Sequence, residues 1–584
     1  MRDGINPQAR PATPDAAWLD AAHSEWLFGE GSHHVPVGLR RIENARLLWL
    51  NQDAAQADPH FAHCGGDLAR YAEHLLAACA WLIDDQPSAG GAGEQAIGHA
   101  DRYGGPGIGM NGGSGRAALV NGYLVKGVGR TPLVSAMTDA GHASGGAYLE
   151  ESVREVIYGE IVRAEFPHSA IPALAIIDTG LVQVWNESAG PRPERRTLLV
   201  RPCFMRPAHF QRATGFYSCY PKEGMFDSLR VATMFERAGA AWGGPGLAAT
   251  YEAFWLNWAC QLAYSFVHRL PHGSNTISNI CLDGKLLDFG ATSAVPSWAN
   301  AATMLAPLPF ARHFEVLPAA LRSNACFFGR YFDNSFAGAQ WIDQLVERAR
   351  LVYRETLMTQ ALRLCGVDRE PALQAAQDWS SNGLWDTLGA VIARFQKERI
   401  DMVEATPQPR LEWDLATVWD EAPAPHLHAL RALLDTLVPA GERAATRQRC
   451  ARLCATRSSL FREETKRAIY RAVDPSHAGQ APDPQHIARF IAQQVAAGRR
   501  DHRLALEGAS TIGFAVGAAG SWVIGRDDGN ASLFAIREGC GDATRLALRR
   551  LTRDGMQFAD PALAPVAAAV CLAGDDAALL ERTA

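Results

Sequence analysis

The stretch YGGPGIGMNGGSGRAALVNGYLVKGVGR (103–130) joins a glycine-rich run to a tight turn between two apolar segments. Asn121-Gly122 separates AALV from YLVK, and this dipeptide between two apolar runs is a strong β-hairpin signal. Because glycines let backbone N–H groups approach phosphates closely, we expect Gly113 and Gly115 to lie against a bound nucleotide. The alternative for such a run, taken in isolation, is a flexible surface loop.

Lys126 ends the second apolar segment of this hairpin. A strand lysine often faces solvent at a sheet edge. The functional alternative is a lysine that holds nucleotide phosphates and pairs with a glutamate on a following helix. The segment 148–166 has apolar residues at helical spacing and supplies Glu155 for this pairing, with Glu151 and Glu160 as competitors. The ordinary interpretation of each glutamate is a solvated surface charge.

Three strand-like runs follow the helix, at 173–178, 181–186 and 197–202, and Thr179-Gly180 joins the first two. Together with the hairpin they predict five short strands, with the helix between the second and the third. This is the element order of the N-terminal lobe of a protein kinase.

A second group of candidate residues follows a long apolar helix predicted over 251–270. Asp283-Gly284 predicts another hairpin, which places Asn279 at its start beside Asp288 at its end. Their oxygens are hard ligands, suited to a cation that bridges nucleotide phosphates. Helix, polar loop, hairpin and Asp-Phe-Gly follow the order of a kinase C-terminal lobe. We therefore expect an α+β, protein-kinase-like two-lobe fold with a five-stranded N-lobe sheet and a mainly helical C-lobe.

Several motifs occur together in one order: GGSGRA, LVKGVGRTP, ESVRE, LLVRP with MRPAHF, HG with SN, and LLDFG. This set resembles the selenoprotein O-like (YdiU-like) protein adenylyltransferases, whose motifs run GDGRA, LKGAGRTP, SIRE, RVA with IRFGSF, HGVxNTDN and IDYGP. The resemblance extends over residues 95–295. It implies a kinase-like fold that binds ATP in a flipped orientation and transfers AMP to a hydroxyl of a protein or peptide.

The resemblance also implies roles for individual residues. Lys126 would hold the nucleotide phosphates, and Glu155 would orient Lys126. Arg116, Arg201 and Arg206 would form a basic clamp on the polyphosphate, since the planar fork of arginine binds phosphate oxygens in pairs. The spacing after Arg201 is two residues shorter than in the family motif, so Arg206 rests on the weakest match.

The metal-binding and catalytic motif departs from the family. Asn279 and Asp288 would hold Mg²⁺ or Mn²⁺, but the family's aspartate before the asparagine, the proposed base, is Ser278 here. A serine hydroxyl has no useful basicity at neutral pH. Two other functions therefore stay open: a true phosphotransferase, and a catalytically weak or dead pseudokinase that binds nucleotide as a scaffold.

The chain of 584 residues is long enough for two or three domains. We expect an N-terminal extension (1–100) that packs on an N-lobe (101–210), followed by a C-lobe (211–405). A linker at 407–414 leads to a divergent C-terminal region (415–584), which is first helical and then rich in strands.

The net charge and the apolar content of the chain limit the kinds of molecule that it is expected to bind. A net charge of −6 gives no sign of nucleic-acid or anionic-membrane binding, and no apolar stretch is long enough to span a membrane. The twelve cysteines are scattered without a C-x-x-C pair. We expect a cytoplasmic protein whose partner is the protein or peptide acceptor; nothing in the sequence indicates an oligomeric state.

Overall fold

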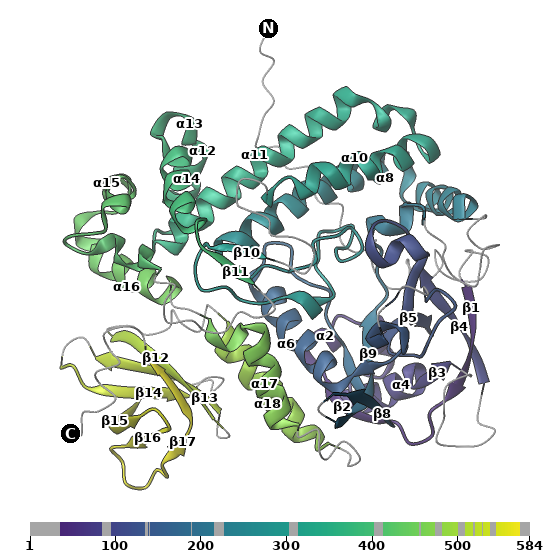
Figure 1. Ribbon diagram of the computed structural model, residues 1–584, viewed down its shortest axis with the longest axis horizontal. Coiled ribbons are helices and arrows are strands. Elements are labelled where there is room, and N and C mark those ends of the chain that lie inside the picture. Colours follow the sequence, from purple (N-terminus) through teal and green to yellow (C-terminus); the bar gives the residue numbers. More distant parts are fainter. Residues whose placement is uncertain are drawn as a thin grey trace.

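The computed structural model describes residues 35–83, 95–134, 138, 140–188, 190–214, 227–302, 313–401, 413–454, 457–473, 482–499, 509–517, 520–527, 530–537 and 545–572. They form a mixed α+β protein with two large antiparallel sheets and a layer of long helices (Figure 1). The first 34 residues of the predicted N-terminal extension and most of the predicted linker lie outside the described residues.

Nine strands form one curled antiparallel sheet in the order β2-β8-β9-β6-β5-β4-β1-β3, with β7 paired to β9. The prediction of five strands is wrong. The segment assigned to an N-terminal extension supplies β1 to β3 and most of β4, Ala147–Tyr148 adds a short strand, and two of the predicted runs form one strand, β8. The predicted boundary at residue 100 falls inside β4, which pairs with β5. The strands are β1 Val35–Arg41, β2 Arg46–Leu50, β3 Trp81–Ile83, β4 Gln95–Arg102, β5 Gly113–Val120, β6 Tyr123–Lys126, β7 Ala147–Tyr148, β8 Ala175–Glu187 and β9 Gly190–Pro202.

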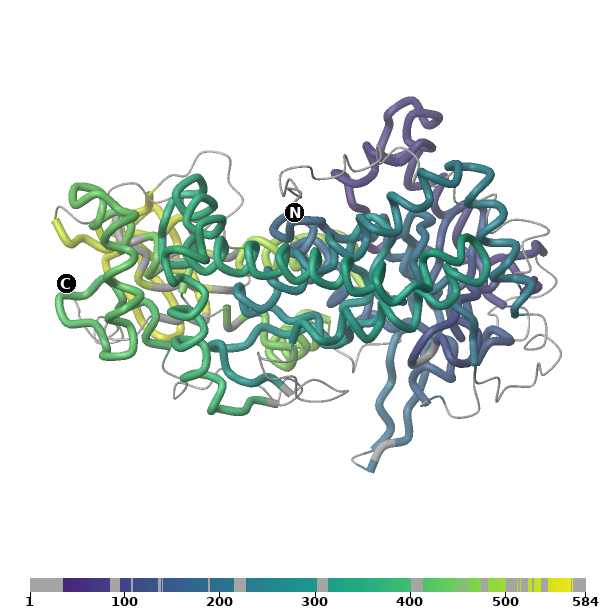
Figure 2. Tube along the Cα trace, turned by 90° about the horizontal axis from the view of Figure 1, so that it is seen from above, coloured from purple at the N-terminus to yellow at the C-terminus, as the bar shows by residue number. Residues whose placement is uncertain are grey.

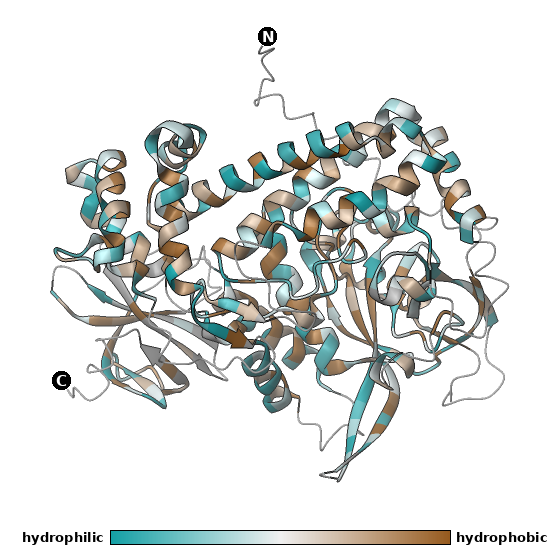
Figure 3. Ribbon diagram, turned by 45° about the horizontal axis from the view of Figure 1, so that its top comes forward, coloured by the Kyte–Doolittle hydropathy of each residue, from teal (hydrophilic) through white to brown (hydrophobic). Residues whose placement is uncertain are grey.

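The two longest strands also differ from the prediction. Thr179-Gly180 is not a turn; β8 runs through it, with irregular pairing to β9 between Asp178 and Val182. Gly180 has a φ of 75°, a left-handed conformation that glycine adopts without strain and that accommodates the irregularity. The outer half of the β8–β9 hairpin projects from the body of the molecule (Figures 2 and 3).

The large sheet separates two hydrophobic cores. Successive residues of a strand point to opposite faces, so Leu198 and Val200 enter one core while Leu199 enters the other. Helix α4 (Leu68–Cys79) covers the first face, and α6 (Leu149–Glu165) covers the second. Helix α6 therefore runs along the face of β6 and β9 that carries the candidate lysine.

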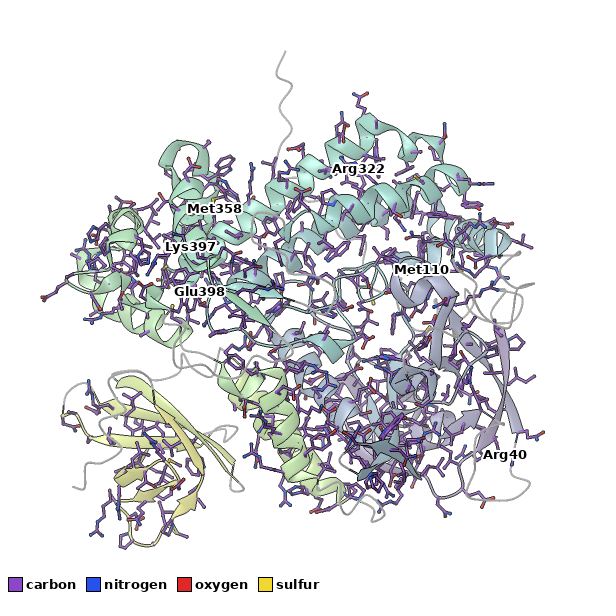
Figure 4. All side chains as sticks on the ribbon, in the orientation of Figure 1. Arg40, Met110, Arg322, Met358, Lys397 and Glu398 are labelled. Atoms are coloured by element: carbon purple, nitrogen blue, oxygen red, sulfur yellow. The ribbon has the colours of Figure 1, made fainter. Side chains whose placement is uncertain are left out.

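Long helices form the middle of the chain, where α11 packs along α8. Helix α8 (Asp227–Val267) is kinked at Gly243, whose φ is 71°, and its second part is the buried helix predicted from residue 251. Residues 300–400 are mostly helical, as predicted, but Asn300–Ala302 (β10) and Arg399–Asp401 (β11) form a parallel pair near the labelled Lys397 and Glu398 (Figure 4). The other helices up to residue 400 are α2 Gln52–Ala55, α3 Pro59–His63, α5 Ala140–Ala143, α10 Val316–Tyr331, α11 Ala339–Leu364, α12 Arg369–Gln377, α13 Trp379–Asn382 and α14 Leu384–Phe395.

The C-terminal region is first helical and then β-rich, in the order predicted. Helices α17 (Arg462–Ala472) and α18 (Pro484–Gly498) pack on α6, and α18 also packs on β2. A second antiparallel sheet with its own small core follows, in the order β17-β16-β15-β14-β13-β12-β18. The helical part of the region begins with α15 His428–Leu437 and α16 Arg443–Cys454. The strands of the second sheet are β12 Ala509–Gly517, β13 Gly520–Asp527, β14 Leu533–Arg537, β15 Leu546–Thr552, β16 Gly555–Phe558, β17 Val566–Ala567 and β18 Ala569–Leu572.

Within the described ranges, no helix is long and apolar enough to cross a membrane.

Candidate functional site

A cavity of about 70 Å³, open to solvent, lies over β5, β6 and β9. Four cationic side chains and one carboxylate line it, together with an apolar wall. A ligand with both an anionic group and a flat apolar part would fit this lining. The lining residues are Tyr103, Asn111, Ser114, Gly115, Arg116, Ala117, Leu124, Lys126, Leu133, Val134, Thr138, His142, Arg201, Phe204, Arg206, Leu287 and Asp288.

Lys126 is positioned by the register of the sheet. Leu124 pairs with Arg201 across β6 and β9, and Lys126 follows two residues later on the same face. The side chain of Lys126 is only 9% exposed and donates a hydrogen bond to Glu155. Its Nζ also lies 2.9 Å from Oε1 of Glu151 and 3.3 Å from Oδ1 of Asp288. Lys126 is therefore not the solvent-facing strand lysine of the alternative interpretation.

Helix α6 presents Glu151 and Glu155 on one face, because residues four apart in a helix lie one above the other. Glu155 is fully buried and joins Lys126 to Arg201. Glu151 joins Lys126 to Arg116, whose fork donates to both of its carboxylate oxygens at 2.7 and 2.9 Å. Glu160, the third competitor, points elsewhere and pairs with Arg163.

These ion pairs shift the ionisation of the buried groups. Burial alone would raise the pKa of Glu151, but the charges of Arg116 and Lys126 outweigh it and hold the pKa well below its usual range. Burial would lower the pKa of Lys126, but Asp288 and the two glutamates raise it above the ordinary value. Both groups are therefore charged at neutral pH.

Asp288 lies in the turn after the second hairpin. Its φ of 63° is left-handed, a conformation that aspartate tolerates better than most residues and that often marks functional sites. Its side chain is 42% exposed at the cavity. Burial would raise the pKa of Asp288. The charges of Lys126, Arg116 and Arg201 outweigh it and hold the pKa far below its usual range. The turn thus presents an ionised carboxylate to the cavity.

Asn279 lies next to this turn, because the backbone N–H of Leu287 donates to the carbonyl of Asn279 at 3.1 Å. The predicted second hairpin is very short: Ile280 and Leu286 form a single bridge around Gly284, whose φ is 90°. The side-chain amide of Asn279 donates to the carbonyl and hydroxyl of Ser274. These two bonds engage the nitrogen and leave Oδ1 as the atom that would ligate a cation.

Asp288 lines the cavity, whereas Asn279 does not. Their oxygens are hard ligands that suit a divalent cation, which would take its remaining ligands from phosphate oxygens and water. One carboxylate and one amide oxygen are too few for a cation site built by the protein alone. The described part of the chain contains no group of three or more His, Cys, Asp or Glu side chains placed to hold a metal.

Arg206 also lines the cavity. Its guanidinium lies over the ring of Tyr103, 4.2 Å from the ring centre, and donates to the carboxylate of Asp101 and to the carbonyl of Ser278 at 2.6 Å. Asp101 also contacts His209 at 2.9 Å. Burial would lower the pKa of Arg206, but Asp101 reverses the direction and raises it. Arg206 is thus held rigidly with its charge intact.

The two predicted phosphate-binding glycines pack against protein. A Cβ on Gly113 would collide with the carbonyl of Asp101, and a Cβ on Gly115 would collide with the side chain of Val134. Gly115 borders the cavity, whereas Gly113 does not. The glycines of this run allow β5 to approach its neighbours closely, and Gly107–Asn111 forms a short 3₁₀ helix instead of an open loop.

Ser278 does not line the cavity. Its hydroxyl is 2.8 Å from that of Thr276, and its carbonyl accepts the bond from Arg206. Ser278 therefore supplies a backbone oxygen to Arg206 and turns its side chain to a neighbouring threonine.

Two supporting residues were not predicted. Asp101 fixes Arg206 but lies at the expected domain boundary, where no motif marks it. His272, part of the quoted HG motif, contacts the carbonyl of Leu287 at 2.9 Å, and burial lowers the pKa of its imidazole. A neutral His272 donates to that carbonyl and holds the strand that leads to Asp288.

The C-terminal region also contacts the turn that contains Asp288. Arg154 of α6 and Arg462 of α17 both donate to the carbonyl of Gly290, at 2.6 and 3.1 Å. The backbone N–H of Ala294 donates to the carbonyl of Leu460 at 2.7 Å. These bonds connect the turn of Asp288 to the helix that carries the two glutamates.

The chain matches no protein-family model, and its sequence matches no curated protein.

Proposed function

We propose that the chain is a nucleotidyltransferase that binds ATP in this cavity and transfers AMP to a hydroxyl of a protein or peptide. The observation that supports this best is the meeting of Lys126, Glu155 and Asp288, which come from a strand, a helix and a turn. Lys126 bonds to both acids although 162 residues separate it from Asp288. Phosphate-transferring sites of kinase type use a lysine, a helix glutamate and a metal-binding aspartate in this combination.

The fold proposal follows from the same elements. The large sheet with α6 would correspond to the N-lobe of a protein-kinase-like fold, and α8 with α10 and α11 to the C-lobe. The sheet–helix–hairpin order and the motif set together support membership of the selenoprotein O-like adenylyltransferases. The additional strands β1 to β4 and the brace from α17 would be elaborations of this chain.

The chain's own side chains would orient the polyphosphate. Arg116, Lys126, Arg201 and Arg206 line the cavity, and charge-assisted bonds to phosphate are strong where water is excluded. Asn279 and Asp288 would hold Mg²⁺ or Mn²⁺, which when bound would neutralise charge on the phosphates. The positions of the four cations would decide which phosphorus atom faces the acceptor.

A second candidate is a nucleotide-binding scaffold with little or no transfer activity. It is favoured by Ser278, whose hydroxyl bonds to Thr276 and is absent from the cavity lining. Against it stands the retention of Asp288 as an exposed, ionised carboxylate. In both cases the partner would be a protein or peptide of the cytoplasm.

Intact-mass analysis of the purified chain after incubation with MgATP and a hydroxyl-rich peptide mixture tests the proposal. An adduct of the mass of AMP, carrying the α-label of ATP, supports adenylyl transfer. A phosphate-sized adduct carrying the γ-label would establish a phosphotransferase instead. Nucleotide binding without any adduct would favour the scaffold, and Asp288→Ala is the control, because it removes the anionic metal ligand.

A further inference from the structure

Glu151 occupies the cationic groups that face the cavity. Its Oε1 accepts from Arg116 at 2.7 Å and lies 2.9 Å from the ammonium of Lys126, while Oε2 accepts a second bond from Arg116 at 2.9 Å. The side chain of Glu151 is 15% exposed, whereas that of Glu155 is completely buried. Of the two helix acids, Glu151 is the one that a ligand entering the cavity could displace.

Arg116 has little capacity left for a ligand in this state. One terminal nitrogen donates to Glu151 and to the carbonyl of Gly146 at 3.0 Å, and the other donates to Glu151. A bidentate bond from Arg116 to a phosphate uses the same two nitrogens. A phosphate and the Glu151 carboxylate therefore compete for the same guanidinium group of Arg116.

The charges around the cavity are balanced before any ligand enters. Among the described residues, Arg116, Lys126 and Arg201 are paired with Glu151, Glu155 and Asp288, three cations with three anions. Arg206 is paired separately with Asp101. A free polyphosphate anion thus meets a neutral set of ion pairs in spite of the four basic side chains that line the cavity.

We propose that Glu151 is an internal anion that competes with phosphate for Arg116 and Lys126 and thereby makes polyphosphate binding depend on a divalent cation. This rests on the proposed function of the cavity and adds a specificity-determining residue to it. Bare polyphosphate has to displace Glu151 without compensation. Polyphosphate that arrives with a divalent cation brings positive charge to Asp288. Asp288 then releases Lys126 to the phosphate, and the positive and negative charges around the cavity are balanced again.

Neutralising Glu151 removes the competitor and leaves the cavity with one excess positive charge. In Glu151→Gln we expect inorganic tripolyphosphate to bind in EDTA at least about tenfold more tightly than to the wild type, because one close charge repulsion is lost. With Mg²⁺ present the two proteins should differ much less. Isothermal titration calorimetry on the full chain measures both affinities. Glu160→Gln, the same change on the same helix away from the cavity, is the matched control and should behave as wild type.

The outcomes separate this inference from the proposed function. If the wild type binds tripolyphosphate with Mg²⁺ but Glu151→Gln gains nothing in EDTA, the competing role of Glu151 is wrong and the cavity proposal stands. If neither protein binds tripolyphosphate in either condition, the cavity proposal itself fails, and the role of Glu151 with it. Should Glu151→Gln not fold, Glu151→Ser removes the same charge. Equal wild-type affinities with and without Mg²⁺ would also overturn the inference.

Discussion

The guanidinium of Arg457 forms a bidentate ion pair with the carboxylate of Glu165, at 2.9 and 3.0 Å. The side chains are 1% and 5% exposed, and Arg457 also donates to the carbonyl of Gly498. The pair fastens the segment before α17 to the end of α6. The C-terminal region therefore supports the helix that carries Glu151 and Glu155.

Breaking this pair should destabilise the whole chain. Arg457→Ala removes the arginine from a buried ion pair, which typically costs about 3–5 kcal/mol. We expect the free energy of unfolding, measured by urea denaturation, to fall by that amount. The control is Arg467→Ala, which removes a pair with Glu464 in which the arginine is 58% exposed and should cost less than about 1 kcal/mol. Equal effects of the two substitutions would contradict a bracing role for Arg457.

The pairing of Lys126 with Glu155 predicts non-additive kinetics. Lys126→Ala and Glu155→Ala each remove the same contact, so the double variant should lose little more nucleotide transfer than Lys126→Ala alone. Transfer rates of the three variants, measured with α-labelled ATP, give the coupling directly. If the two losses multiply, Glu155 acts through Arg201 or another group and not through Lys126.

The sequence predicted the contacts of the site better than the extent of the fold. The Asn-Gly hairpin and the helical spacing of 148–166 led to Lys126 and Glu155, because both signals are local. The same spacing could not decide between Glu155 and Glu151, since residues four apart share a face, and the structure uses both. The choice depends on how α6 packs on the sheet, which is a tertiary property.

The strands and the residue that the sequence did not predict depend on tertiary contacts as well. β1, β2 and β3 were not predicted, because they pair with strands far away in sequence; β4 was missed although one of its partners, β5, follows closely. Thr179-Gly180 resembles a turn locally, but pairing with β9 on both sides keeps the strand extended. Asp101 carries no motif, and its importance appears only when Arg206 folds back against it over 105 residues.

Two buried histidines predict acid sensitivity between neutral pH and pH 4. Burial lowers the pKa of His209 and of His313 from 6.5 to about 4. In this window the unfolded chain binds protons that the folded chain does not, so stability is full above the unfolded pKa and falls as the pH drops towards 4. The loss is at most about 1.4 kcal/mol per pH unit for each histidine.

Urea denaturation between about pH 7 and about pH 5 measures this dependence. We expect the double variant His209→Asn, His313→Asn to be less stable than the wild type at neutral pH, and its stability to fall less steeply with acid. An unchanged slope would mean that other groups account for the acid sensitivity.

The last prediction concerns Ser278, which stands where the resembled family has its proposed base. The hydroxyl of Ser278 is 2.8 Å from that of Thr276, and the side chain is not part of the cavity lining, so Ser278→Ala should change nucleotide transfer little. Ser278→Asp introduces a carboxylate one residue before Asn279. If that carboxylate reaches the acceptor hydroxyl, transfer should rise, since general base catalysis contributes about 10²–10⁴-fold.

The backbone of Ser278 makes this test selective. Its carbonyl accepts the 2.6 Å bond from Arg206, which neither substitution removes, so a change in rate reports on the side chain. Initial rates with α-labelled ATP and one fixed acceptor give the comparison, and ATP binding by calorimetry serves as the control for an intact cavity. A large loss of transfer in Ser278→Ala with unchanged ATP binding would show that the hydroxyl takes a direct part, for example as the acceptor of the transferred group.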